Sequence, residues 1–306
     1  MMDKYCEFTR MVDLISTQNP LQKKRISSFI NKQDENYWRY AEEICRKLNQ
    51  SFFKDEQERA EAARSYNRMS MDFLREQIRF SKTGVYCVND LDLARKNVYS
   101  NPNVMRYYMV GLLLSYLLWP NHFKILSFLR DHIKGISINK HLDIAPGHGL
   151  FTVEVLKRFP GIKSELLDIS KTSIEVTNEI LTAFNIKKSN YNFINGDFLT
   201  VSMEGSQFDF ITMGEVLEHV NDAPGFLKRA ADLLQPKGTI FMSTCANCPA
   251  IDHVYHFRDP DEIRLLIDGA GLSIMKEEVH LVDALPKQVC SKDLEASNYC
   301  AILVKK

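Results

Sequence analysis

One short segment, LDIAPGHGLFT (residues 142–152), combines a carboxylate with two glycines. The apolar residues at its start and the helical pattern that follows predict a strand, a tight turn and the beginning of a helix. Gly147 and Gly149 in such a turn allow a flat or charged ligand to approach the backbone closely. Asp143 adds a negative charge at the mouth of the turn, so the ligand must be one that favours a carboxylate.

Two ligand classes that use glycine turns do not fit this segment. A phosphate-binding P-loop requires a Lys-Ser/Thr pair after its last glycine, and none follows Gly149. The dinucleotide pattern GxGxxG is incomplete because Thr152 stands at the third glycine position. A carboxylate beside a pyrophosphate also costs about 1 to 4 kcal/mol at a separation of roughly 4 Å. S-adenosylmethionine carries a sulfonium and an ammonium and no phosphate, so the turn predicts a site for this cofactor.

Further acids follow the next apolar runs in order. Asp168 ends ELLDIS, where a carboxylate accepts hydrogen bonds from ribose hydroxyls. Asp197 ends the third run, within reach of an adenine amino group, and Phe198 beside it is placed to pack on the base. Glu215 and Glu218 follow the fourth run, in GEVLEHV. One such acid alone would be interpreted as a helix cap, but four successive strand ends at one sheet edge favour a ligand site.

The spacing of apolar residues changes along the chain and divides it into a helical domain (residues 1–135) and an α/β domain (residues 136–306). In the first part, residues 39–48, 55–80 and 104–133 show helical spacing, with breaks at Pro20, Thr83-Gly84, Asn101-Pro102 and Trp119-Pro120. From His141 on, short apolar runs alternate with helical patterns, which predicts a mostly parallel sheet covered by helices. Two closing strands follow each other directly, so one of them should be antiparallel. The expected strands are HLDIA, SELLDIS, NYNFINGD, FDFITMG, GTIFMST, SIMKEEVHLV and NYCAILVKK.

Residues 141–306 resemble a class I S-adenosylmethionine-dependent methyltransferase, through DIAPGHG, LLDIS, NGDF, FDFITMGEVLEHV and LLQPKGTIFMST. The resemblance implies a Rossmann-like, seven-stranded sheet whose last strand is antiparallel. It also implies cofactor contacts for the methionine moiety (Asp143, Ala145, Gly147, Gly149), the ribose (Asp168, Ile169), the adenine (Asp197, Phe198) and the edge near the reactive methyl (Gly214, Glu215). The chain departs from the usual pattern at Ala145-Pro146, where a glycine commonly opens the turn.

The methyl acceptor is expected between the sheet edge and the helical domain. Candidate general bases are His219, after the fourth strand, and His253 and His256 in the loop CPAIDHVYHFRDP. In methyltransferases of this type that loop commonly faces the acceptor, so Tyr255 and Arg258 join the candidates. The helical domain contributes Arg106 and Tyr108 as candidate substrate contacts. For each of these residues a purely structural role is the alternative, most of all for His219.

No metal is expected from the sequence. The pair CANC at Cys245 and Cys248 lies near His253 and His256, but one CxxC without a second pair is weak evidence for zinc. No calcium loop of the DxDxDG type is present. We therefore expect metal-independent transfer.

Composition limits the partners. The 306 residues carry 39 basic and 39 acidic side chains, so there is no positive excess for nucleic acid or a membrane surface. The apolar run of about ten residues at Met109–Trp119 is shorter than the roughly 20 that span a bilayer. Seven scattered cysteines and a polar N-terminus predict a reduced, cytoplasmic protein.

The architecture is similar to that of natural-product O-methyltransferases. The main expectation is an enzyme that methylates an oxygen of a small molecule or natural-product precursor and releases S-adenosylhomocysteine. One alternative acceptor is the C-terminal carboxylate of a ribosomally made peptide. A second alternative is a non-catalytic S-adenosylmethionine-binding module whose helical domain binds a partner. A homodimer is compatible with all three.

Overall fold

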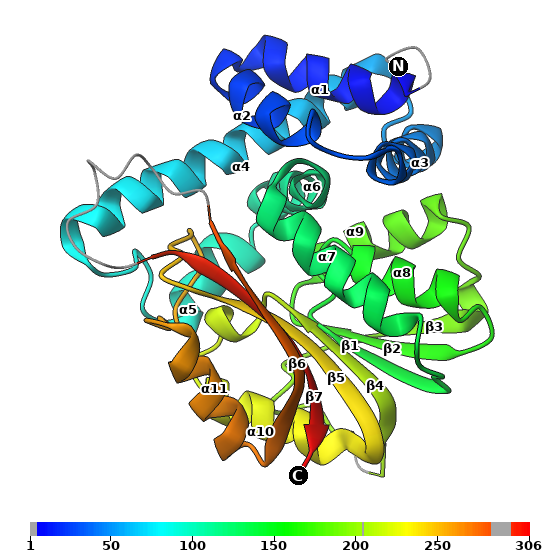
Figure 1. The fold of residues 1–306 in the computed structure, drawn as a ribbon, viewed down its shortest axis with the longest axis vertical. Helices are drawn as coiled ribbons and strands as arrows, with labels where there is room; N and C mark the ends of the chain where they lie inside the picture. The colour runs from blue at the N-terminus through cyan, green and yellow to red at the C-terminus, as the bar shows by residue number, and fades with distance from the viewer. Residues whose placement is uncertain (1–4, 204, 283–294) are drawn as a thin grey trace.

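The computed structural model describes residues 5–203, 205–282 and 295–306, and it contains one seven-stranded sheet (Figure 1). The strand order is β3-β2-β1-β4-β5-β7-β6. The first five strands are parallel, and β7 runs antiparallel to both β5 and β6, which confirms the expected Rossmann-like sheet. The strands are β1 (Lys140–Ile144), β2 (Lys163–Asp168), β3 (Tyr191–Asn195), β4 (Phe208–Gly214), β5 (Leu234–Ala246), β6 (Leu272–Leu281) and β7 (Ser297–Lys305).

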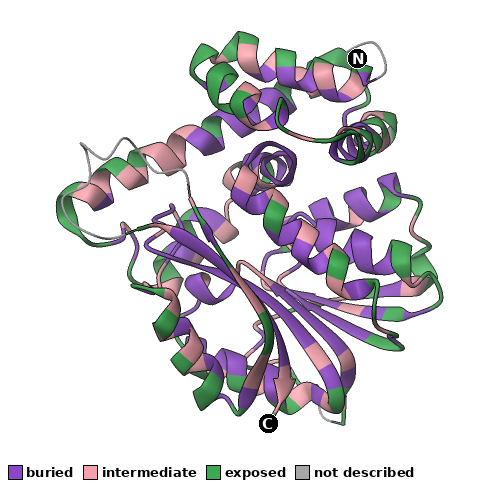
Figure 2. Ribbon diagram, viewed as in Figure 1, coloured by how far each residue is buried: buried purple, intermediate pink, exposed green. Residues whose placement is uncertain are grey.

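Helices cover both faces of this sheet. On one face lie α8 (Leu150–Arg158) and α9 (Lys171–Ala183), and on the other lie α10 (Ala223–Leu233) and α11 (Pro260–Gly269). Successive strand residues alternate between the two faces: Phe210 packs toward α8 and α9, whereas Ile211 packs toward α10 and α11. Both faces are therefore apolar, and the strands are buried along most of their length (Figure 2).

The N-terminal part is helical, as expected, and its breaks fall where proline and glycine stand. Pro20, Pro102 and Pro120 each occupy the first turn of a helix, and Gly84 ends α4 in a left-handed conformation. The helices α1, α2 and α5 and the turn η2 were not individually predicted. The helices are α1 (Cys6–Gln18), α2 (Pro20–Ile30), α3 (Glu35–Ser51), α4 (Glu56–Thr83), α5 (Leu91–Ala94), the π-helical turn η2 (Arg95–Tyr99), α6 (Pro102–Leu118) and α7 (Pro120–Ile133).

One hydrophobic core joins the N-terminal helices to the sheet. It runs without interruption from α1 through α6 and α7 to α8, α9 and the sheet. Polar contacts cross the same boundary: Glu154 on α8 accepts a hydrogen bond from the Tyr40 hydroxyl (3.0 Å) and pairs with Arg130 (3.1 Å). The expected boundary at residue 135 falls in the connection between α7 and β1, but the core does not divide there.

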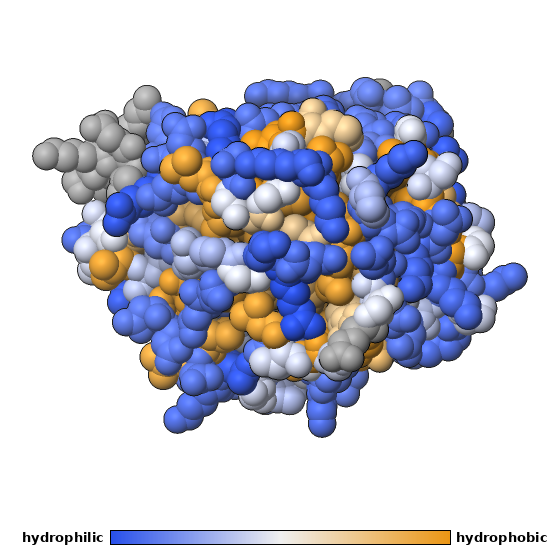
Figure 3. Space-filling model, turned by 90° about the horizontal axis from the view of Figure 1, so that it is seen from below, coloured by the Kyte–Doolittle hydropathy of each residue, from blue (hydrophilic) through white to orange (hydrophobic). Residues whose placement is uncertain are grey.

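Within the described residues, no helix is both long enough and apolar enough to cross a lipid bilayer. The face of the molecule seen in Figure 3 is mainly hydrophilic, and hydrophobic side chains show between the polar ones.

Candidate active site

A cavity of about 750 Å³ lies between the carboxyl ends of the strands and the helices α2, α4 and α6. Parallel α/β sheets bind their ligands at this edge, because loops at the strand ends leave a crevice there. Of the expected cofactor residues, those that line the cavity are Ala145, Gly147, Asp168, Ile169, Asp197, Phe198, Gly214 and Glu215.

The turn after β1 forms one wall of the cavity through Ala145, Pro146 and Gly147. Ala145 and Gly147 both have a φ of 58°, in the left-handed region that favours glycine. The turn closes with a hydrogen bond from the Gly149 amide to the Pro146 carbonyl (2.8 Å). This conformation explains why a glycine is common at the position of Ala145, and it shows that the Ala-Pro pair keeps the left-handed backbone.

Asp143 and Gly149 lie behind this wall and are not among the lining residues. Asp143 is buried and accepts a hydrogen bond from the Thr152 hydroxyl, while its Oδ1 has no partner. Burial raises the pKa of Asp143 to about 6. Gly149 packs so closely on α9 that an added Cβ would lie 2.9 Å from Thr177 Cγ2. Their placement indicates that they shape the turn from behind.

Asp168 ends β2 with its carboxylate at the cavity. One oxygen accepts a hydrogen bond from the Ser170 amide (2.8 Å), and the other accepts one from the Ser173 hydroxyl (2.6 Å). These contacts fix the carboxylate while each oxygen keeps a second lone pair. Burial raises the pKa of Asp168 above its ordinary value. A carboxylate that is fixed in this way is suited to accept hydrogen bonds from two neighbouring ribose hydroxyls.

The end of β3 supplies Asp197 and Phe198. Asp197 pairs with Arg95 of η2 (3.4 Å), so the N-terminal helices contribute to this part of the site. Phe198 packs against Phe226 of α10, with ring centroids 4.6 Å apart, and the Arg229 guanidinium lies 5.2 Å from its ring. The arrangement fits an adenine contact, and Arg95 was not among the residues predicted for the site.

Gly214 and Glu215 form the floor of the cavity at the end of β4. Gly214 is needed for packing, because an added Cβ would lie 2.0 Å from Phe151 Cε2. Glu215 has a φ of 50°, and its Oε2 accepts a hydrogen bond from Asn298 (2.7 Å). Its Oε1 is buried without a partner, and burial raises the pKa of Glu215 to about 7. A buried carboxylate oxygen with no donor is a place where a cationic ligand belongs.

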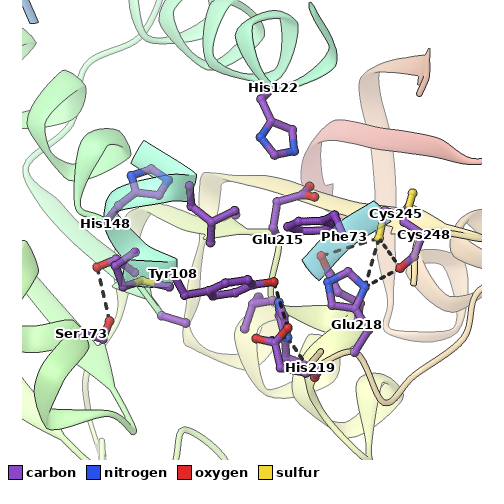
Figure 4. A pocket seen from close by; sticks show the side chains of 18 of the residues that line it. Phe73, Tyr108, His122, His148, Ser173, Glu215, Glu218, His219, Cys245 and Cys248 are labelled. Carbon is purple, nitrogen blue, oxygen red and sulfur yellow. Dashed lines mark hydrogen bonds and ion pairs between the residues drawn. The ribbon is translucent and has the colours of Figure 1, made fainter. Parts of the chain in front are cut away.

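Beyond Glu215 lies a polar cluster around Asp252, in the loop after β5. Asp252 accepts hydrogen bonds from Tyr108 (3.1 Å) and Tyr99 (3.4 Å), and it lies 3.4 Å from His219 Nδ1. His253 stands edge-on to His219, with ring centroids 4.7 Å apart. In Figure 4, Tyr108, His219 and Glu218 surround the same part of the cavity. Tyr108, His219 and His253 thus lie where candidate acceptor residues were expected.

Cys245 and Cys248, the two cysteines of the CxxC pair, lie beside this cluster. Cys245 Sγ is 3.9 Å from Glu218 Oε1 and 3.8 Å from His253 Nδ1. Burial raises the pKa of the Cys245 thiol well above its ordinary value. Cys248 contributes its backbone carbonyl, which lies 2.6 Å from His253 Nδ1.

Four expected residues lie outside the cavity lining, which corrects their expected placement. Arg106 turns to the surface and pairs with Glu179 through both guanidinium nitrogens (2.9 and 2.8 Å). His256 packs between Phe80 and Tyr86 and contacts Asn247 (2.9 Å).

The other two residues of this group also belong to the loop after β5. Tyr255 packs against Phe257, and Arg258 has a side chain that is 74% exposed. The loop therefore turns only its first half, with Asp252 and His253, toward the cavity.

Several lining residues were missed from the sequence. Asp252 lies in the loop whose histidines were candidate general bases. Its position next to His253 could have identified it as a further residue of the site. Tyr99 belongs to a π-helical turn, where helical spacing gives no prediction. Phe73 and Trp119 lie in predicted helices, but spacing alone did not show that the fold turns them into a cavity.

The fold and the cavity define an S-adenosylmethionine-binding methyltransferase. A left-handed turn after β1, held carboxylates after β2 and β3, and an unpaired carboxylate oxygen after β4 fit the methionine, ribose, adenine and charged parts of that cofactor.

Comparisons with known proteins agree with this class. A family model described as a methyltransferase domain matches residues 37–277. The chain belongs to this methyltransferase domain family. S-adenosylmethionine is the cofactor of this class of enzymes.

The curated relatives match over a shorter stretch. The ubiquinone biosynthesis O-methyltransferase of Idiomarina loihiensis is 30% identical over 119 residues, which cover 39% of this chain and 47% of the relative. The malonyl-[acyl-carrier protein] O-methyltransferase 1 of Ilyobacter polytropus is 32% identical over 106 residues, covering 35% and 38%. The chain thus spans less than half the length of these two relatives.

Solved structures support the fold. Mitomycin 7-O-methyltransferase MmcR is 13% identical with a TM-score of 0.52, and the match covers 100% of this chain and 97% of that one. An O-methyltransferase family protein from Burkholderia thailandensis is also 13% identical with a TM-score of 0.52, covering 79% and 71%.

Proposed function

We propose that the protein transfers the methyl group of S-adenosylmethionine to an oxygen atom of a small organic molecule. The proposal rests on one observation: the expected cofactor wall and an apolar wall on α4 and α6 belong to the same cavity. The curated relatives and the MmcR structure are O-methyltransferases by name, which supports oxygen as the acceptor atom.

The cofactor would lie along the turn after β1 and the ends of β2 and β3. Bound there, S-adenosylmethionine supplies a methyl group activated by a positive sulfur. Asp168 would accept hydrogen bonds from the ribose hydroxyls, Phe198 would pack on the adenine, and the Glu215 carboxylate would face the positive charge. The chain's part is to hold the methyl group close to the acceptor and in line with it.

The acceptor part of the cavity is built for a flat apolar molecule. Phe73 of α4 stacks nearly parallel on Tyr108 of α6, with centroids 6.1 Å apart and an interplanar angle of 12°. Trp119 meets Phe73 edge-on at 5.5 Å. These rings exclude water, and the polar cluster of His219, Asp252 and His253 lies at the end of the apolar wall, where an acceptor hydroxyl finds its partners.

A methylation screen tests the proposal. The purified protein is incubated with methyl-labelled S-adenosylmethionine and separate panels of phenols, aliphatic alcohols, carboxylic acids and short peptides. We expect label in hydroxyl-bearing small molecules. Label only at peptide C-termini would instead support a peptide carboxylate as acceptor. Cofactor binding without transfer to any panel would support a non-catalytic binding module.

A pair of variants separates the acceptor wall from the cofactor wall. Phe73→Ala removes a ring from the acceptor side, so we expect a higher KM for the acceptor and an unchanged affinity for S-adenosylmethionine. Phe29→Ala, which removes a ring from α2 outside the cavity lining, serves as the control for losing an aromatic side chain. An equal change of KM in both variants would argue against an acceptor site at Phe73.

A further inference from the structure

Three metal-binding side chains meet on the acceptor side of the cavity. Glu218, His219 and His253 each bring one potential ligand atom to within 4.8 Å of the other two. Glu218 and His253 are buried, and the His219 side chain is 20% exposed. All three line the cavity. We call these residues the EHH cluster.

The two histidine rings are oriented as metal ligands are. Within the described residues, the hydrogen bonds of both rings run through Nδ1. His253 Nδ1 faces the Cys248 carbonyl oxygen at 2.6 Å, and His219 Nδ1 faces the Asp252 carbonyl oxygen at 3.2 Å and its carboxylate at 3.4 Å. The Tyr99 hydroxyl also lies 3.0 Å from His219 Nδ1. Because Nδ1 makes these contacts in both rings, Nε2 is the nitrogen of each ring that remains for a metal, as in the usual outer-shell arrangement.

The charge of this region favours a cation. Five carboxylates line the cavity: Asp168, Asp197, Glu215, Glu218 and Asp252. Among the described lining residues, the Lys and Arg side chains are Lys24 and Arg25, and both are exposed on α2. Among the described residues, the side-chain donors to the Glu218 carboxylate are neutral: the Thr244 hydroxyl (2.7 Å) and the Cys245 thiol (3.9 Å). A buried carboxylate so placed is stabilised by a positive partner.

We propose that the EHH cluster binds one divalent transition-metal ion, with zinc as the best match. Two histidine nitrogens and one carboxylate oxygen form a common three-ligand set that leaves a fourth position open. The nitrogen and oxygen ligands of one tetrahedral zinc ion lie about 3.3–3.6 Å apart, so atoms that lie within 4.8 Å of one another reach this spacing by side-chain movements of up to about 1.5 Å. The two cysteines of the CxxC pair are not part of this set: Cys248 orients His253 through its carbonyl, and Cys245 is a neutral neighbour.

The ion and the cofactor occupy different parts of the cavity. In Figure 4, Ser173 and His148 lie on one side of Glu215, whereas Glu218, Cys245 and Cys248 lie on the other. Ser173 holds Asp168, so its side is the expected ribose side. The open metal position therefore faces the acceptor.

The catalytic role of the ion rests on the proposed O-methyl transfer, but its binding does not. A hydroxyl bound to zinc loses its proton more readily, as zinc-bound water does. The deprotonated acceptor oxygen then forms a bond to the methyl carbon, the carbon–sulfur bond breaks with its electron pair on sulfur, and the proton passes to solvent. The products are the methyl ether and S-adenosylhomocysteine.

Metal titration without cofactor or acceptor tests the site. The protein is stripped with a chelator and titrated with Zn²⁺ against a chromophoric chelator, and with Co²⁺ followed by visible absorption. We expect one equivalent of metal and a Co²⁺ spectrum without a thiolate charge-transfer band. Glu218→Gln and His253→Ala should each weaken binding at least about tenfold.

Matched controls keep the result interpretable. His132→Ala on α7 and Glu61→Gln on α4 remove the same residue types away from the cavity and should retain full affinity. Where Glu218→Gln fails to fold, the more exposed His219→Ala takes its place, with folding checked by circular dichroism. No stoichiometric binding, equal binding by all variants, or a thiolate band that brings Cys245 into the ligand set would overturn the proposal. The methylation screen is independent of these outcomes.

Discussion

At the scale of single residues, the cavity wall holds backbone conformations that side chains rarely adopt. Ala145 and Glu215 have φ values of 58° and 50°, and both line the cavity. Such strain persists where the surrounding structure imposes it, and it gathers at ligand sites. The left-handed turn explains how a chain with Ala145-Pro146 keeps a shape that usually contains glycine.

Replacing Ala145 by glycine should not destabilise the protein. The left-handed conformation costs alanine roughly 1–2 kcal/mol, and the entropic cost of glycine is about 0.5–1 kcal/mol. We expect Ala145→Gly to leave the free energy of unfolding unchanged or to raise it by up to about 1.5 kcal/mol. Urea denaturation measures this change.

The matched control is Ala60→Gly, in the interior of α4. Its helical backbone gives glycine no advantage, so this variant should lose about 1 kcal/mol. A loss at Ala145 as large as the loss at Ala60 would show that the turn is not strained.

Asp143 should make the stability of the cofactor-free protein depend on pH. Its pKa is raised to about 6 from an ordinary 3.8, so the folded state favours the protonated carboxyl. The stability contribution of Asp143 is complete below about pH 4 and is lost as the pH rises through about 6. Thermal unfolding of wild type and Asp143→Asn from about pH 5 to about pH 7 should show a larger fall of Tm in the wild type.

The exposed Asp232→Asn on α10 is the control for losing a carboxylate, and it should keep the wild-type pH profile. Parallel profiles for Asp143→Asn and the wild type would argue against a raised pKa at Asp143.

At the scale of secondary-structure elements, the sheet could be predicted well and the helices less completely. Most strands coincide with a short apolar run between polar turns, and this alternation can be recognised in the sequence. Four of the predicted helix boundaries are set by a proline in the first turn of a helix or by a glycine at its end. The helices α1 and α2 were not individually predicted, although the buried Phe8, Met11, Val12 and Ile15 of α1 follow helical spacing. The end of α10 and the start of β5 meet directly at Leu233-Leu234, where no turn residue separates them.

The contact between β4 and α8 depends on Gly214. An added Cβ would lie 2.0 Å from Phe151 Cε2, so Gly214→Ala should lower the free energy of unfolding by about 1–3 kcal/mol. In a Phe151→Leu background the same substitution should cost less, because the ring that it meets is gone.

Gly161→Ala is the control, since a Cβ at that position meets no atom within 4 Å. We expect it to leave stability nearly unchanged in the same urea measurement. An equal cost of Gly214→Ala in both backgrounds would show that Phe151 is not the cause.

At the scale of the whole molecule, the site could be predicted only in part. The cofactor residues follow consecutive strands, so topology brings them to one edge. The acceptor side joins α4, η2 and α6 to the loop after β5, and Tyr99 and Tyr108 meet Asp252 across 153 and 144 residues of chain. Sequence spacing does not encode such long-range contacts. For this reason Asp252 was missed, and four residues expected at the cavity lie outside its lining: Arg106, Tyr255, His256 and Arg258.

The continuous core predicts that the N-terminal helices and the sheet unfold together. The two tryptophans, Trp38 and Trp119, report only on the N-terminal helices, whereas circular dichroism reports on the whole chain. We expect coincident urea midpoints for the two signals. Leu126→Ala, in the fully buried core of α7, should lower both by the same amount, about 2–5 kcal/mol in unfolding free energy. A fluorescence transition at lower urea than the dichroism transition would show that the helices unfold as a separate unit.

We propose above all that this cavity binds S-adenosylmethionine through the carboxylate at the end of β2. Isothermal titration calorimetry of the cofactor into wild type, Asp168→Ala and the surface control Glu61→Gln tests it most directly. Two hydrogen bonds to a charged group are worth roughly 3 kcal/mol together, so Asp168→Ala should weaken binding about 100-fold. Glu61→Gln should bind as the wild type does. No binding by the wild type, or equal affinity in the folded Asp168→Ala variant, would contradict the account.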